Sequence, residues 1–414
     1  MGVEPMDVVF PRCAGLDVHK KSVVACVAIR DGGIASKEVR TFGTTTRQLH
    51  ALRAWLRESG VTQVAMESTA SYWKPVFNLL EAEFTPWVVN PAHIKQVPGR
   101  KTDIKDAEWI ADLLQHGLLR PSFIPDRAQR ELRELTRYRT SLVGERAREV
   151  NRIQKVLEGG NIKIGNVLSD VLGVSGTRML QALAQGETDP VRLAALADDR
   201  VRATPEMLQE ALEGLMGAHQ QFLLQQQLEH LAALDRTLAQ LDAEVADRLR
   251  PFAEILRRLQ TIPGVGRRTA EVLVAEIGPT VRAFRTAAAL AAWIGVAPGN
   301  KESAGKRLAG TTRKGNKALR AALVEAAHAA GRTKATYLGA QYRRAVRTKG
   351  TKRAAVIVAH SIAVSLWHML HDEEDYTDLG VDYFDHRDVE QTKRHAVKRL
   401  ERLGFTVQLT ASAS

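Results

Sequence analysis

The 414-residue sequence contains very little cysteine. Its two cysteines, Cys13 and Cys26, are too few and too isolated for a disulfide framework or for a zinc site with four protein ligands. We therefore expect two small, buried thiols in a protein of a reducing compartment.

The sequence also has no hydrophobic run long enough to predict a membrane-spanning helix. Its longest uncharged stretch, Ala354 to Leu370, includes two serines and two histidines and is more typical of a buried helix. The first residues include Glu4 and Asp7 in place of the basic start and apolar core of a secretory signal. We expect a cytoplasmic protein without a membrane partner.

The net charge of +12 is unevenly distributed along an otherwise ordinary composition. With 44% hydrophobic and 26% charged residues, the chain has the composition of a soluble globular protein of two or three domains. The block from Lys301 to Arg353 contains 15 Lys and Arg against two acids, so the rest of the chain sums to −1. Such a block favours a polyanionic partner, and nucleic acid above an anionic membrane, because no lipid-anchoring pattern accompanies it. A solvated basic face is the alternative.

Strand and helix patterns alternate over the first 115 residues. Alternating and β-branched apolar residues predict strands, and apolar residues three and four apart predict helices. The predicted strands cover residues 13–19, 23–29, 37–42, 63–67 and 87–90, and the predicted helices cover 46–58, 72–84 and 101–114. Three strands followed by alternating helices and strands indicate a mixed sheet covered on both faces.

The middle of the chain is predicted to be helical. An arginine-rich helix covers residues 125–157, and shorter pieces follow over 161–204. A second long helix has apolar residues at seven-residue spacing, which is typical of a coiled-coil seam. The seam residues are Leu224, Leu231, Leu238 and Val245. Because the seam is short, it fits a helical hairpin within one chain as well as a contact between two chains.

Four acidic residues are candidates for one metal site. Asp103 and Asp106 are three residues apart on a predicted helix and lie on one face. Asp17 lies in the first predicted strand and Glu67 ends the fourth, where a carboxylate among apolar neighbours needs a partner or a metal. Such acids can converge on two divalent ions that clamp the oxygens of a phosphoryl transfer. Alternatively, the helical acids only complement the helix dipole and Asp17 is an ordinary strand-end acid.

A turn of sequence Pro-Gly-Val-Gly joins two predicted helices over residues 259–270. Gly264 and Gly266 would let backbone N–H groups approach a phosphate, and Arg267 and Arg268 add positive charge. The stretch resembles the helix-hairpin-helix element of DNA-binding proteins, although a plain glycine-rich turn is the alternative.

Ser303 lies in a loop rich in glycine and cations. This environment favours an oxyanion on the serine and a phosphate beside it, so Ser303 is a candidate nucleophile; a hydroxyl that only contacts phosphate is the alternative. The candidate nucleic-acid-binding cations are Lys301, Lys306, Arg307, Arg313, Lys314 and Lys317 near this loop, and Lys101 before the helical acids.

Five motifs in this order are similar to those of the IS110-type family of insertion-sequence transposases, and the similarity covers nearly the whole chain. The motifs are Gly-Leu-Asp-Val-His-Lys around Asp17, Met-Glu-Ser-Thr around Glu67, Lys-Thr-Asp-Ile-Lys-Asp-Ala around Asp103 and Asp106, Pro-Gly-Val-Gly, and Ser-Ala-Gly-Lys-Arg with Thr-Arg-Lys-Gly-Asn around Ser303. The resemblance implies an N-terminal α/β domain of the RuvC-type, RNase H-like fold, a helical coiled-coil segment and a mostly α-helical C-terminal domain. We expect these over residues 10–124, 125–250 and 251–372, with an extension over 373–414.

The resemblance also implies the chemistry and the partners. Asp17, Glu67, Asp103 and Asp106 would bind Mg²⁺, as two ions that Mn²⁺ can replace, and Ser303 would form a covalent phosphoserine link with DNA. The implied partners are donor and target DNA and a structured noncoding guide RNA. Because two DNA duplexes must be brought together, we also expect a homodimer or homotetramer. The middle segment, 161–250, is longer than in compact members of the family.

Two other functions stay open at this point. A metal-dependent nuclease of the Holliday-junction type would use the four carboxylates with water as the nucleophile. A nucleic-acid-binding protein with an inert site is the third possibility, although all four acids are present. We assign no role to residues 372–375 or to the tail after Gly404.

Overall fold

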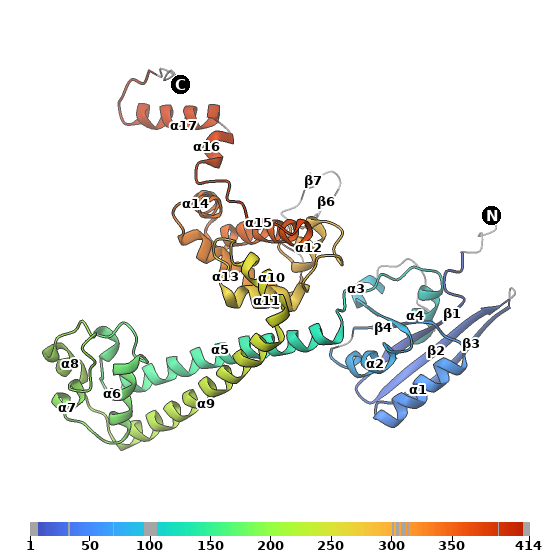
Figure 1. The fold of residues 1–414 in the computed structure, drawn as a ribbon, viewed down its shortest axis with the longest axis horizontal. Coiled ribbons are helices and arrows are strands. Elements are labelled where there is room, and N and C mark those ends of the chain that lie inside the picture. Colours follow the sequence, from blue (N-terminus) through green and yellow to red (C-terminus); the bar gives the residue numbers. More distant parts are fainter. Residues whose placement is uncertain are drawn as a thin grey trace. The chain divides into compact units, whose positions relative to one another are not determined.

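The computed structural model divides into two compact units, Met1–Arg127 and Ala128–Ser414. It describes residues 7–31, 34–68, 70–94, 106–299, 302–303, 306–307, 312, 314–387 and 389–408. A mixed five-stranded sheet lies in the first unit and the second unit is mostly helical (Figure 1). This confirms the fold class expected at the level of a mixed sheet followed by helices.

The sheet has the strand order β3-β2-β1-β4-β5. The first three strands pair antiparallel, because short turns join them, whereas β4 and β5 join parallel to β1 through helical crossovers. The strands are β1 (Arg12–Val18), β2 (Ser22–Asp31), β3 (Ile34–Gly43), β4 (Gln63–Glu67) and β5 (Thr85–Val89).

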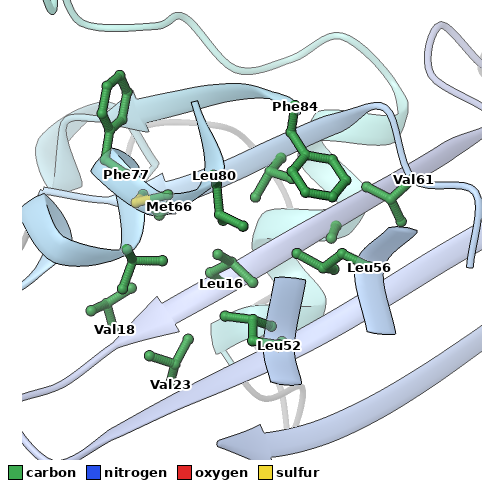
Figure 2. Close-up of a cluster of buried hydrophobic side chains, with 14 of the residues drawn as sticks. Leu16, Val18, Val23, Leu52, Leu56, Val61, Met66, Phe77, Leu80 and Phe84 are labelled. Carbon is green, nitrogen blue, oxygen red and sulfur yellow. The ribbon is translucent and has the colours of Figure 1, made fainter. Parts of the chain in front are cut away.

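Helices cover both faces of this sheet, as the sequence predicted. Side chains alternate along each strand, so β1 turns Leu16 and Val18 toward α1 and α2 and turns Cys13 toward α4. The first face forms the larger core, in which Leu52 and Leu56 of α1 pack on Leu16 (Figure 2). The helices are α1 (Thr46–Glu58), α2 (Trp73–Leu80), α3 (Pro91–Ile94) and α4 (Asp106–Gln115).

Two long helices of the second unit, α5 (Arg127–Gly159) and α9 (Ala218–Arg248), form an antiparallel hairpin (Figure 1). Ion pairs join them side by side. As the α5 partner advances from residue 131 to 149, the α9 partner retreats from 248 to 230, so the helices run in opposite directions. The ion pairs are Glu131–Arg248 at 3.1 Å, Arg139–Asp242 at 2.5 Å and Arg146–Asp235 at 2.5 Å, and His230 Nδ1 of α9 lies 3.3 Å from Glu149 Oε2 of α5.

A small helical tip closes one end of this hairpin. Its buried residues pack around Leu224 and Leu231, the first two positions of the predicted seam. The seam therefore packs within one chain at this end; a coiled-coil supercoil stays a prediction. The tip is built from η1 (Ile164–Asn166), α6 (Val174–Ala184), α7 (Pro190–Ala194) and α8 (Pro205–Leu212).

The remaining residues form a helical C-terminal body. Helix α15 lies at its centre and contacts α10, α12, α13 and α14. By length and mean hydropathy, 1.5, α15 is the one candidate membrane span among the described residues. Half of its apolar window is buried: Val358 and Ile362 are fully buried, whereas Ile357 is 37% exposed, so the burial expected over 354–370 is confirmed for one face of the helix. The helices are η2 (Arg250–Phe252), α10 (Ala253–Leu259), α11 (Arg267–Ile277), α12 (Ala287–Ile294), α13 (Lys317–Arg332), α14 (Tyr337–Lys349), α15 (Thr351–Asp372), α16 (Tyr383–Arg387) and α17 (Val389–Arg402).

The acidic stretch after α15, which had no predicted role, is a contact of this body. Asp375 accepts hydrogen bonds from both terminal nitrogens of Arg257 in α10, at 2.9 and 3.0 Å. The Arg257 guanidinium lowers the pKa of the Asp375 carboxyl. Backbone N–H of Tyr376 donates to Thr261 Oγ1 at 3.0 Å, so the chain after α15 is fixed beside the start of the Pro-Gly-Val-Gly turn.

Candidate active site

Two of the predicted acids end neighbouring strands. Asp17 is the penultimate residue of β1 and Glu67 is the last residue of β4. The parallel register pairs Leu16 with Met66, so the next residue on each strand is one of the two acids. Leu16 and Met66 point into the core under α1 and α2, and alternation therefore directs Asp17 and Glu67 to the face covered by α4.

Helix α4 begins near this pair of strand ends because it packs tightly on β1. A side chain at Gly15 would place its Cβ 2.3 Å from the Ala107 carbonyl oxygen, so only glycine allows this approach. Farther down β1, Cys13 Sγ lies 3.6 Å from the Ala111 carbonyl oxygen. The helix therefore starts toward the Asp17 end of the strand, and Asp106 is its first residue. Asp103 and Lys101 lie outside the described residues.

The chemistry of these residues suits a divalent cation with oxygen ligands. Carboxylates are the usual protein ligands of Mg²⁺. A cation or a helix N-terminus beside a carboxyl group stabilises its ionised form. Among the residues that the structure describes, no three Asp, Glu, His or Cys side chains form a ready metal cluster. Asp17, Glu67 and Asp106 are the described residues that would hold such an ion.

His19 is a contact of Asp17 that the sequence reasoning did not assign. Its Nε2 lies 3.0 Å from Asp17 Oδ2, and the exposed fraction is 57% for the His19 side chain and 19% for the Asp17 side chain. The motif Gly-Leu-Asp-Val-His-Lys contains both residues two positions apart, and that spacing is the signal that would have suggested the pair.

Ser303 lies in a short antiparallel ribbon of the second unit. The ribbon consists of β6 (Glu302–Ser303) and β7 (Lys306–Arg307), and the register pairs Ser303 with Lys306. The backbone thus places a predicted cation opposite the predicted nucleophile. Lys301 and Arg313 lie outside the described residues.

The two ends of the chain segment that carries this ribbon meet at a pair of glycines. Gly295 ends α12 in the left-handed region, with φ of 86°. A Cβ on Gly315 would lie 2.4 Å from the Gly295 nitrogen, so the two backbones touch. Next to them, the Asn316 N–H donates to the Trp293 carbonyl oxygen at 3.1 Å. The segment from Val296 to Lys314, which contains Ser303, is therefore closed at its base.

The Pro-Gly-Val-Gly turn joins α10 to α11, and its glycines differ in role. Gly264 has φ of 88°, and a Cβ there would lie 2.2 Å from the Ala326 carbonyl oxygen of α13. Gly264 is therefore needed for packing, as expected for a plain glycine-rich turn. Gly266 has open space around it and precedes the first N–H groups of α11, which keeps it available to a phosphate.

The cations predicted to bind phosphate are in two different situations. Arg267 and Arg268 both pair with Glu271, at 3.0 Å each, and Arg268 also pairs with Asp242 of α9. A phosphate would have to share these guanidinium groups with carboxylates. Lys314 and Lys317 are exposed at the start of α13.

Comparison with known proteins identifies the family. Residues 14–162 match the family model DEDD_Tnp_IS110, described as a transposase, and residues 256–343 match the model of the IS116/IS110/IS902 transposase family. Together the two models match more than half of the sequence.

The chain belongs to the IS110 family of transposases.

Curated relatives agree with this assignment. A "Probable family 20 transposase" of Pseudomonas aeruginosa is 26% identical over 332 residues, which are 78% of this chain and 88% of the relative. The "Transposase for insertion sequence element IS1111A" of Coxiella burnetii is 25% identical over 76% of this chain and 79% of its own length. The predicted family is thus confirmed. Because a transposase processes DNA, the chain is a DNA-processing enzyme. The IS110 model's DEDD designation suggests divalent-metal dependence.

Proposed function

We propose that this transposase excises and inserts its insertion sequence by cleaving and rejoining DNA strands through a covalent phosphoserine link at Ser303. The acids Asp17, Glu67, Asp103 and Asp106 would hold Mg²⁺, as two ions that Mn²⁺ can replace. The observation that supports this best is the position of Asp17 and Glu67 on adjacent strand ends, with α4 and Asp106 starting beside them.

In the proposed cleavage step, Ser303 Oγ attacks a DNA phosphorus atom. The bond from Oγ to phosphorus forms and the bond from phosphorus to the oxygen of the leaving strand breaks. The serine hydroxyl loses its proton, and the leaving oxygen takes up a proton to become a hydroxyl. The phosphoserine link keeps the energy of the broken bond, so the hydroxyl of a second strand can reverse the step without an external nucleotide. Bound Mg²⁺ would supply charge stabilisation at the phosphate.

The N-terminal unit supplies the acids and the second unit supplies Ser303. The mixed sheet with acids at the ends of its central strands supports the RuvC-type, RNase H-like assignment. We expect α10, the turn and α11 to act as a helix-hairpin-helix at the DNA backbone through Gly266, Arg267 and Arg268, with Gly264 allowing the turn to pack on α13.

Covalent trapping on labelled DNA tests the serine mechanism. The wild-type chain should give a protein–DNA adduct that survives denaturation, and Ser303→Ala should lose both adduct and cleavage. Asp17→Asn should lose cleavage while Ser303 is present, because the metal site is incomplete. If Ser303→Ala still cleaves DNA, the serine is not the nucleophile. The alternative of a metal-dependent nuclease that uses water would then hold.

Purification from the host tests the proposed noncoding RNA. We expect one discrete RNA, encoded beside the gene, to accompany the protein, with the arginine-rich helix α5 and the block from Lys301 to Arg353 as its binding surfaces. A mixture of unrelated RNA fragments would contradict a guide role.

Sedimentation of the DNA-bound complex should give two or four copies of the chain, since two DNA duplexes must be joined.

A further inference from the structure

Glu276 is a fully buried carboxylate that the proposed chemistry does not use. It lies at the end of α11 and its side chain has an exposed fraction of 0%. Arg137 of α5 donates to both of its oxygens, from Nε to Oε1 at 2.7 Å and from Nη2 to Oε2 at 2.9 Å. A buried charge of this kind is stable only while such partners are present.

A second arginine of α5 strengthens the same contact. Arg133 Nε lies 3.5 Å from Glu276 Oε2 and donates to the Ala275 carbonyl oxygen at 3.3 Å. Its guanidinium also lies over the ring of Trp293 in α12, 5.8 Å from the centroid. Burial lowers the pKa of Arg133 to about 10, which still leaves it charged at neutral pH. Two turns of α5 are thus fixed against the ends of α11 and α12.

The third partner of Glu276 belongs to the base of the Ser303 segment. Asn316 Nδ2 donates to Glu276 Oε2 at 2.6 Å. Its Oδ1 accepts a hydrogen bond from the Leu319 N–H at 3.1 Å, which caps α13. Its own N–H donates to Trp293, as described above. Asn316 therefore closes the serine segment, starts α13 and is held by Glu276.

We propose that Glu276 is a positioning residue for strand cleavage, which fixes the base of the Ser303 segment to α5 through Asn316. This inference rests on the proposed role of Ser303. Glu276 does not act as a base, because it is buried and both oxygens already accept hydrogen bonds from Arg137 and Asn316. The contact therefore fixes the base of the serine segment to α5 within the second unit.

Asn316→Ser is the most selective test. Serine caps a helix about as well as asparagine but lacks the amide that reaches Glu276, so α13 stays capped while the contact is lost. We expect adduct formation at saturating DNA to slow by about tenfold or more, with the DNA dissociation constant changed less than about threefold. Removing Glu276 itself would leave Arg133 buried without its carboxylate, and such a chain could fail to fold.

Thr336→Ala is the matched control. Thr336 caps α14 in the same body by accepting a hydrogen bond from the Gly339 N–H at 3.1 Å, and it has no contact with Glu276. It should lower the melting temperature without slowing cleavage. If Thr336→Ala slows cleavage as much as Asn316→Ser, the effect is general destabilisation and the inference is wrong.

A rescue pair supplies the second readout. Asn316→Asp keeps the cap but places a carboxylate against Glu276, so it should be slower than Asn316→Ser. Adding Glu276→Gln restores a donor between the two side chains and should recover part of the rate. This inference alone is overturned by no recovery in a double variant whose circular dichroism matches the wild type, or by a normal rate for Asn316→Ser in a chain that forms the adduct. An active Ser303→Ala overturns the proposed function and this inference with it.

Discussion

Single residues decide how closely the elements of the candidate site approach each other, and Gly15 is the clearest case. Its absent side chain lets the backbone of α4 contact β1 at Ala107 and Ala111. Because Asp106 precedes Ala107, the position of this proposed ligand depends on the same contact.

Gly15→Ala should therefore lower both stability and activity. The added Cβ would lie 2.3 Å from the Ala107 carbonyl oxygen and 2.4 Å from the Ala111 nitrogen, so α4 must move. Overpacking of this kind costs about 1 to 3 kcal/mol. We expect urea unfolding to show that loss and cleavage to fall with it. Gly159→Ala, where a Cβ meets nothing within 4 Å, is the control and should leave both nearly unchanged. Equal stability of the two variants would contradict the close approach.

The two thiols give a pH-dependent prediction. Burial raises the pKa of Cys13 from 9.0 to about 12 and that of Cys26 from 9.0 to about 11. Between pH 9 and 11 the native state therefore keeps protons that the unfolded state loses, so the thiol contribution is fully present below pH 9 and falls as pH rises. From pH 8 to 10, unfolding free energy should fall by about 1 to 3 kcal/mol more in the wild type than in Cys13→Ala/Cys26→Ala. Denaturant titrations at both pH values measure this, and identical losses would contradict it.

What the sequence could predict at this scale depends on the distance between partners along the chain. Arg267, Arg268 and Glu271 are three and four residues apart on one helix, so their ion pairs could have been expected before any phosphate was assigned. Glu276 and Arg137 are 139 residues apart, and only the packing of α5 on α11 brings them together. The positions of Asp17, Glu67 and Asp106 were predictable because strand ends and a helix start fix where they lie, whereas their role as metal ligands stays a prediction.

At the scale of elements, periodicity predicted individual helices and strands well but not their pairing. Helix α1 and strand β4 have the predicted bounds. Helix α2 was predicted to extend through Phe84 but ends at Leu80, and residues 81–84 form a turn and a bend. The prediction was too long because Phe84 keeps the helical spacing, and its N–H still donates to the Leu80 carbonyl oxygen. The seven-residue repeat of α9 indicated an apolar stripe, whereas the choice of α5 as its partner depends on ion pairs distant in sequence.

Leu224 should carry much of the stability at the hairpin tip. It is fully buried in the tip core, so Leu224→Ala should cost about 2 to 5 kcal/mol, through lost burial and the cavity left behind. Leu215→Ala is the matched control, because Leu215 is 83% exposed, and it should change stability by less than about 0.5 kcal/mol. Thermal unfolding followed by circular dichroism compares the two. Similar effects would mean that Leu224 is not a core residue in solution.

At the scale of the whole molecule, charge is concentrated in one part of a chain that is otherwise nearly neutral. The block from Lys301 to Arg353 accounts for more than the entire net charge. Nucleic-acid affinity should therefore depend strongly on salt, since each phosphate contact releases a counterion.

Lys317→Ala should weaken nucleic-acid binding several-fold and reduce the slope of log affinity against log salt by about one. Lys317 is exposed and lies in the basic block, beside the Ser303 segment. Arg192→Ala is the control, because Arg192 lies in the tip and pairs with Glu187 at 3.4 Å. Binding isotherms at several salt concentrations separate the two variants. An unchanged slope for Lys317→Ala would exclude a phosphate contact there.

The antiparallel course of α5 and α9 has a consequence for evolution and engineering. A helical hairpin of this kind can be shortened or lengthened by matched turns of both helices, or given a different tip, while the C-terminal body keeps its own contacts. The ion pairs repeated along α5 and α9 would keep the two helices in register in such a variant. Transposases that differ mainly in the length of this hairpin would therefore keep the same C-terminal body.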